Sequence, residues 1–269
     1  MSTATLTPPA PAAPRSAGPR RRRRLLAVAS PLTLMLLWEL LSRFDVVDSR
    51  VLPPPTAVLV RIGELTAGGD LLPHVEATVV RFAAGLSLGV VAGTLVGLTM
   101  GLFATPRAIL SPIIAMIYPL PRIAMFPLIL IIVGFNERAN ILEITLAPFF
   151  TMAISTMGAV LAIDPVYRDV ARSFETGTRD LYLRVTLPAT LPAIMGSLRV
   201  SVGLALMSTT AVEFLAASSG LGYLIWHAWQ ILSLKDCLAG MVVAGILGSV
   251  AYLAVGVLDR WLVPWQRRT

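Results

Sequence analysis

The sequence predicts an all-α fold, a polytopic membrane helix bundle with about six transmembrane helices. Composition is the first sign, because 56% of the 269 residues are hydrophobic and only 14% are charged, whereas soluble domains carry about 25% charged residues. The second sign is a set of uncharged stretches that reach the roughly 20 residues a spanning helix needs. Together these observations exclude a disordered chain and argue against a soluble enzyme.

The expected spans differ in how cleanly they are apolar. Segments 82–106, 144–163 and 238–258 contain no charged residue at all. The first segment follows a basic run and resembles a signal peptide, but no small-residue cleavage site comes after it, which favours a retained span. The expected membrane domain covers 25–262, with spans at 25–43, 77–104, 109–134, 140–162, 192–216 and 237–262.

Basic residues predict the orientation of the bundle in the cell membrane. Six spans place both ends on one side, and membrane proteins concentrate Arg and Lys in cytoplasmic segments. That rule favours an N-in/C-in topology, with a disordered basic tail over 1–24 and a short cytoplasmic tail over 263–269. The basic residues then expected inside are Arg15, the five arginines at 20–24, Arg107, Arg168, Arg172, Arg179, Arg184, Arg260, Arg267 and Arg268.

The same orientation explains a pI of about 10.5 and a net charge of +7. In a soluble protein these values would suggest nucleic acid, but here the arginine run anchors a span, and we expect no nucleic-acid partner. A lone cysteine, Cys237, allows no intrachain disulfide. His74 and His227 are isolated, so the sequence predicts neither a metal site nor a cofactor.

One expected helix carries glycine at every fourth position. That spacing keeps the glycines on one helix face, where a smooth strip lets a neighbouring backbone approach closely. We interpret the strip as a packing face, against another helix of this chain or a second subunit. Its members are Gly85, Gly89, Gly93, Gly97 and Gly101.

Two polar features inside the spans are candidates for a translocation pathway. Arg122 lies among Pro119, Pro121 and Pro127, which remove backbone donors and disturb the helix, and an ionisable residue within the membrane is a functional-site hypothesis. It can meet an anionic substrate, or lie near the cytoplasmic end and snorkel. Glu213 leaves the same alternatives open. Its neighbours Ser208, Thr209 and Thr210 would make a polar patch on the fifth expected helix.

The longest expected cytoplasmic loop, 164–191, combines dense charge with recurring apolar residues. Asp164 followed by Pro165 is typical of a helix start, and Gly177 would end that helix. Pro188 and Pro192 are expected to break the chain before the fifth span. A short amphipathic helix here can dock a partner or lie on the membrane surface.

The loop resembles the cytoplasmic motif of the integral permease subunits of type I binding-protein-dependent ABC importers, Glu-Ala-Ala-x3-Gly-x9-Ile-x-Leu-Pro. Asp169-Val170-Ala171 takes its first three places, and Val185-Thr186-Leu187-Pro188 takes its last four at the same spacing. Glu175 departs from the family pattern, because it stands where that family has glycine, and Gly177 follows two places later. Residues 50–55, 171–174 and 219–224 further resemble the nitrate, sulfonate and taurine branch.

The resemblance implies a permease chain that is not itself an enzyme. It implies four kinds of contact: a second permease chain, two ABC ATPase subunits, a soluble extracytoplasmic binding protein and the lipid bilayer. A phosphate loop needs Gly-Lys followed by Ser or Thr, and the only lysine, Lys235, follows Leu234. The residues that the resemblance assigns to ATPase coupling are Asp169, Val170, Ala171, Arg172, Phe174, Glu175, Gly177, Leu181, Leu187 and Pro188.

The expected function is the ATP-driven import of a small solute, which the branch suggests is an anion such as a sulfonate, nitrate or taurine. A vitamin precursor as solute of the same importer type is the first alternative. An ion-driven secondary transporter is the second, although no internal repeat is seen and acids within the spans are few. A membrane-embedded enzyme would need clustered His, Asp or Cys, which the sequence does not show.

Overall fold

The computed structural model describes residues 20–44, 46–164, 166, 173, 177 and 180–265. The regular elements in these ranges are all helices, which confirms the all-α prediction. By its internal contacts the chain divides into two compact units, Met1–Thr56 and Ala57–Thr269.

The first unit contains helix α1 (Arg20–Arg43), which covers the first expected span. Glu39, the acid in this apolar stretch, accepts hydrogen bonds from the Thr56 amide at 3.1 Å and the Thr56 hydroxyl at 2.8 Å. It also pairs with Arg43 at 2.5 Å, and the Ser42 hydroxyl donates to the Leu52 carbonyl at 2.7 Å. Glu39 therefore holds Thr56, in the segment that follows α1, against the end of that helix.

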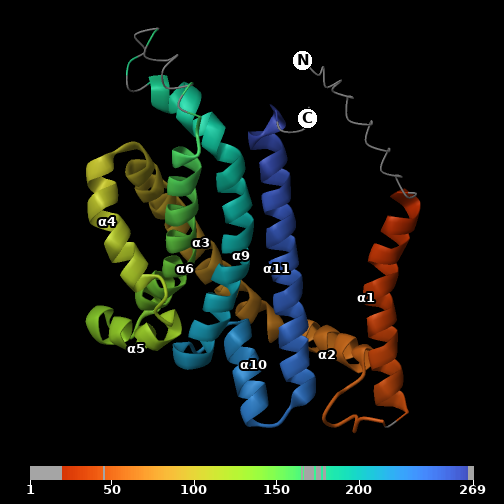
Figure 1. The fold of residues 1–269 in the computed structure, drawn as a ribbon. Coiled ribbons are helices and arrows are strands. Elements are labelled where there is room, and N and C mark those ends of the chain that lie inside the picture. Colours follow the sequence, from red (N-terminus) through yellow and green to blue (C-terminus); the bar gives the residue numbers. More distant parts are fainter. Residues whose placement is uncertain are drawn as a thin grey trace, which may run out of the picture. The chain divides into compact units, whose positions relative to one another are not determined.

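Helix α2 (Pro55–Ala67) begins in the first unit and continues into the second, where all the remaining helices lie. In Figure 1, α5 and α10 lie at the end of the second unit opposite to the start of α9 and the end of α11. The remaining elements are α3 (Leu71–Leu102), α4 (Ala104–Ile117), α5 (Arg122–Val133), α6 (Glu137–Leu161), a π-helical turn (Leu181–Thr186), α9 (Leu187–Ala216), α10 (Leu221–Gln230) and α11 (Leu234–Leu262).

Four helices within the described residues are long and apolar enough to cross a membrane: α3, α6, α11 and the helix that ends at Ala216. The pair α4 and α5 makes a fifth if it is counted as one span. This number agrees roughly with the six expected. Short helices α2 and α10 were not predicted, because neither is long enough to give a spanning signal.

The third expected span, 109–134, is not one straight helix. Helices α4 and α5 meet at an angle of 104°. Pro119 and Pro121 fall in the break and remove two backbone donors, and Pro121 is extended, with φ −69° and ψ 98°. The sequence located the disturbance but not the size of the turn, and the turn places Arg122 at the first position of α5.

The expectation that Pro188 and Pro192 break the chain is wrong. Helix α9 begins at Leu187 and runs through both prolines to Ala216. Pro188 lies in the first turn, where the missing N–H would have no intrahelical partner in any case. Pro192 lies in the helix interior, so the fifth expected span starts earlier than residue 192.

The core of the second unit lies where α3, α5, α6 and α9 meet. Phe126, Ile144, Met152 and Val212 there are each 0% exposed. The outward faces are apolar too, and Leu88 on α3 is 56% exposed. Apolar side chains both inside and outside are what a bundle surrounded by hydrocarbon requires.

Helix α2 is tied to the start of α11 by charge. Arg61 donates to the Asp236 carboxylate and also pairs with Glu64 at 2.9 Å. The Asp236 and Glu64 carboxylates raise the pKa of the Arg61 guanidinium above its ordinary value. The ion pair therefore joins the middle of α2 to the first turn of α11.

Candidate functional site

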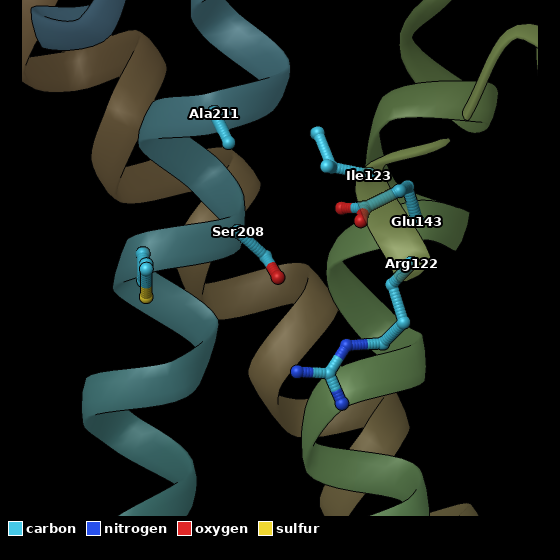
Figure 2. A pocket seen from close by; sticks show the side chains of 6 residues that line it. Arg122, Ile123, Glu143, Ser208 and Ala211 are labelled. Carbon is cyan, nitrogen blue, oxygen red and sulfur yellow. The ribbon is translucent and has the colours of Figure 1, made fainter. Parts of the chain in front are cut away.

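A cavity of about 220 Å³ lies among α5, α6 and α9. Figure 2 shows its lining side chains, which come from both sides of the gap between α9 and the α5–α6 pair. Apolar side chains make up half of the lining and polar or charged ones the other half. The lining residues are Arg122, Ile123, Glu143, Met207, Ser208 and Ala211.

Arg122 reaches the cavity because the chain turns sharply just before it. It is the first residue of α5 and is half-buried. The ion pairs that the described residues form within 4.0 Å do not include it. Its guanidinium therefore lies at the cavity wall without a salt bridge to any of the described residues.

Glu143 is the functional candidate that sequence reasoning missed. It lies on α6 at 1% exposure, and its Oε2 atom accepts no hydrogen bond from any residue that the structure describes. In Figure 2 its carboxylate points from α6 toward α9, into the gap that Ser208 faces. The signal available in the sequence was a single acid within an apolar span. Nothing in that pattern showed that it lacks a partner.

The other two expected pathway residues do not line the cavity. Thr209 is 0% exposed and donates its hydroxyl to the Ala205 carbonyl at 2.8 Å. Glu213 is also 0% exposed and is fully engaged elsewhere. Only Arg122 and Ser208 of the four proposed residues face the cavity.

Glu213 forms the centre of a buried polar cluster. It accepts from Arg81 Nη1 at 3.0 Å, from the Thr78 hydroxyl at 2.9 Å and from the Gly222 amide at 2.8 Å. Gly220 has φ +120°, and a Cβ atom there would lie 2.2 Å from Glu213 Cδ. The cluster therefore specifies glycine at position 220.

Arg81 extends the cluster to α6. Its Nε and Nη2 atoms donate to Glu137 at 2.7 and 2.6 Å, a bidentate geometry, and Nη1 donates to the Ser219 carbonyl at 2.6 Å. One buried guanidinium thus joins α3, α6, α9 and the turn before α10. Because all its donors are engaged in this way, Arg81 holds these helices together.

The glycine strip of α3 lies against α6 of the same chain. A Cβ atom added at any of its five positions would come within 2.4 to 2.6 Å of an α6 atom. At Gly93 that atom is the Phe149 carbonyl oxygen, and at Gly97 it is the Ala153 carbonyl oxygen. The backbones of α3 and α6 therefore approach so closely that no side chain fits between them.

Most of the expected coupling loop lies outside the described residues, namely Asp169, Val170, Ala171, Arg172, Phe174 and Glu175. Of the rest, Gly177 is exposed, Leu181 begins the π-helical turn, and Leu187 and Pro188 lie in the first turn of α9. The Asp164 carboxylate accepts the Val166 amide at 2.9 Å.

No group of three or more His, Cys, Asp or Glu residues with metal-binding geometry occurs in the described part of the chain.

A protein-family model described as the inner membrane component of binding-protein-dependent transport systems matches residues 86–268. The chain belongs to this family. As a permease it is 30% identical to the aliphatic sulfonates transport permease protein SsuC of Bacillus subtilis, over 93% of this chain and 90% of that one. It is 32% identical to the taurine transport system permease protein TauC of Escherichia coli, over 92% of each.

Solved structures show the same fold. A chain from inward-facing conformations of the MetNI methionine ABC transporter matches this permease with a TM-score of 0.63. The match covers 71% of this chain and 95% of that chain, at 20% identity. The similarity shows that the two chains share a fold over the matched part.

Proposed function

We propose that this permease forms the translocation pathway of an ATP-driven importer for small sulfonate-type solutes. The unpaired guanidinium of Arg122, in the cavity among α5, α6 and α9, is the observation that carries the proposal. A sulfonate is a permanent anion, and a partly desolvated arginine attracts an anion far more strongly than a solvated one does. The sulfonate and taurine transport permeases among the relatives support the same solute class.

The energy source in this proposal is a pair of partner ATPases. The motif over 169–188 resembles the coupling loop of importer permeases, apart from Glu175 in the place of glycine, and we infer that it docks into a groove on each ATPase. A second permease chain completes the pathway, and a soluble binding protein delivers the solute on the outside. Nucleotide and loaded binding protein then bias two states of the pathway, as alternating access requires.

The proposal is tested by uptake into proteoliposomes. The permease is reconstituted with its cognate ABC ATPase and binding protein, with ATP trapped on the ATPase side. Uptake of labelled taurine or ethanesulfonate should require ATP, the ATPase and the binding protein together. Uptake that continues without ATP would instead indicate an ion-driven carrier, and failure to move either sulfonate in the complete system would overturn the solute class.

A further inference from the structure

The cavity is lined by two groups of opposite charge that form no salt bridge with each other. Arg122 and Glu143 both line it, yet no nitrogen of one lies within 4.0 Å of an oxygen of the other. Opposite charges in a low-dielectric site gain energy by pairing. A pair held apart across a cavity leaves space between the charges for a molecule that complements both.

The rest of the unit treats its buried charges differently. Buried Arg81 pairs with buried Glu213 at 3.0 Å and with exposed Glu137 at 2.6 Å. The partly exposed Arg199 pairs with Asp259 at 2.6 Å. Glu143 is as buried as Glu213, at 1% and 0% exposure, but has an Oε2 atom that accepts no hydrogen bond within the described residues. An unpaired buried carboxylate is costly, and a cationic group on a ligand in the adjoining cavity would offset that cost.

The size of the cavity restricts that ligand. About 220 Å³ is well above the roughly 10–15 Å³ that holds one water. It is below the range of about 300–1,000 Å³ for drug-sized ligands. A solute with a few carbon atoms fits. Ser208 adds a hydroxyl to the wall opposite Glu143 (Figure 2).

We infer that the cavity binds its solute as a zwitterion, with the solute's ammonium group at Glu143 and its sulfonate group at Arg122. This inference rests on the proposed function, which supplies the sulfonate, and it deepens it by specifying an aminoalkanesulfonate. A plain alkanesulfonate would meet Arg122 equally well but would leave Glu143 unpaired and add a second anion to the cavity. The permease then contributes selectivity of its own.

The experiment measures binding to the purified permease–ATPase complex without the binding protein. Labelled taurine is titrated in a scintillation proximity assay, and unlabelled ethanesulfonate competes for the site. The two probes share the carbon chain and the sulfonate and differ in the ammonium group. In the natural protein taurine should bind at least tenfold more tightly than ethanesulfonate.

Variants separate the two charges. Glu143→Gln keeps the shape of the side chain and removes its charge, so the taurine preference should disappear. Glu143→Asp should retain part of that preference, and Arg122→Gln should weaken both probes. Glu76→Gln, the same change at an exposed residue of α3, should change neither. The ratio of the two affinities is read within one preparation, so partial loss of folded complex cancels.

Equal affinity of the natural protein for both probes, or a taurine preference that survives Glu143→Gln, would overturn the zwitterion assignment. The absence of taurine binding to the complex would overturn it as well. ATP-dependent uptake of sulfonates is scored separately in proteoliposomes. If the natural system takes up sulfonates but gives any of these binding results, the zwitterion assignment is rejected and the proposed function stands. If the complete natural system takes up no sulfonate, both are rejected.

Discussion

Arg81 and Glu213 form an ion pair with Nη1 3.0 Å from Oε1, although 132 residues separate them in the chain. They are 4% and 0% exposed. The pair belongs to a cluster that joins α3, α6 and α9, and neither member of the pair lines the cavity. One set of charges therefore holds the helices together, whereas Arg122 and Glu143 at the cavity form no salt bridge with any described residue.

Replacing Arg81 by alanine should strongly destabilise the protein. Glu213 would remain buried without its counterion, and breaking a buried pair typically costs about 3–5 kcal/mol of the free energy of unfolding. Thermal melting of the purified protein in detergent measures the loss. Arg138→Ala is the matched control, because Arg138 is exposed and its loss should cost less than about 0.5 kcal/mol. Similar melting of the two variants would show that the cluster contributes little.

Gly93→Ala should separate α3 from α6. The new Cβ atom would lie 2.4 Å from the Phe149 carbonyl oxygen, so the helix backbones must move apart, at a cost of about 1–3 kcal/mol in the free energy of unfolding. Gly158→Ala on α6 is the control, since no atom lies within 4 Å of its added Cβ. It should be neutral or stabilising, because alanine favours helix by about 1 kcal/mol.

Gly220→Ala tests whether the turn before α10 is specified by Glu213. A positive φ alone costs an alanine about 1–2 kcal/mol, and the control Gly69→Ala, with φ +80° and open space around it, should show that cost only. Gly220→Ala should cost more, because its Cβ atom would overlap the Glu213 carboxylate. Equal losses in the two melting curves would remove the steric part of the explanation.

Ala171→Asp should disrupt contact with the ATPase. In the coupling motif this position takes a small residue, and a charged side chain there should prevent close docking. Co-purification with tagged ATPase should fall by at least tenfold, and ATP-dependent uptake with it. Ala162→Asp, at the exposed end of α6, carries the same change outside the motif and should preserve the complex. An undisturbed complex in Ala171→Asp would reject the docking assignment.

Hydropathy predicted the helical membrane class because spanning helices must be long and apolar. It could not predict α2 and α10, which span nothing, nor the 104° angle between α4 and α5. The prolines revealed that the helix is disturbed, but the direction of the chain after Pro121 depends on packing against α6 and α9. The predicted break at Pro188 was wrong because proline is compatible with the first turn of a helix.

The candidate site was half predictable. Arg122 and Ser208 were found as polar residues within a span, a local signal. Glu213 has the same local signal and yet belongs to the structural cluster, because Arg81 and Gly222, distant in sequence, satisfy it. Glu143 was overlooked for the converse reason, since the absence of a partner is visible only once the helices are assembled.

The most direct test of the account is the initial rate of ATP-driven taurine uptake in Arg122→Gln proteoliposomes. If solute crosses through the cavity among α5, α6 and α9, this variant should lose at least tenfold in rate while its complex with the ATPase and its melting temperature stay unchanged. The control Arg107→Gln, at the start of α4, should transport normally. Full taurine uptake in Arg122→Gln would contradict the account.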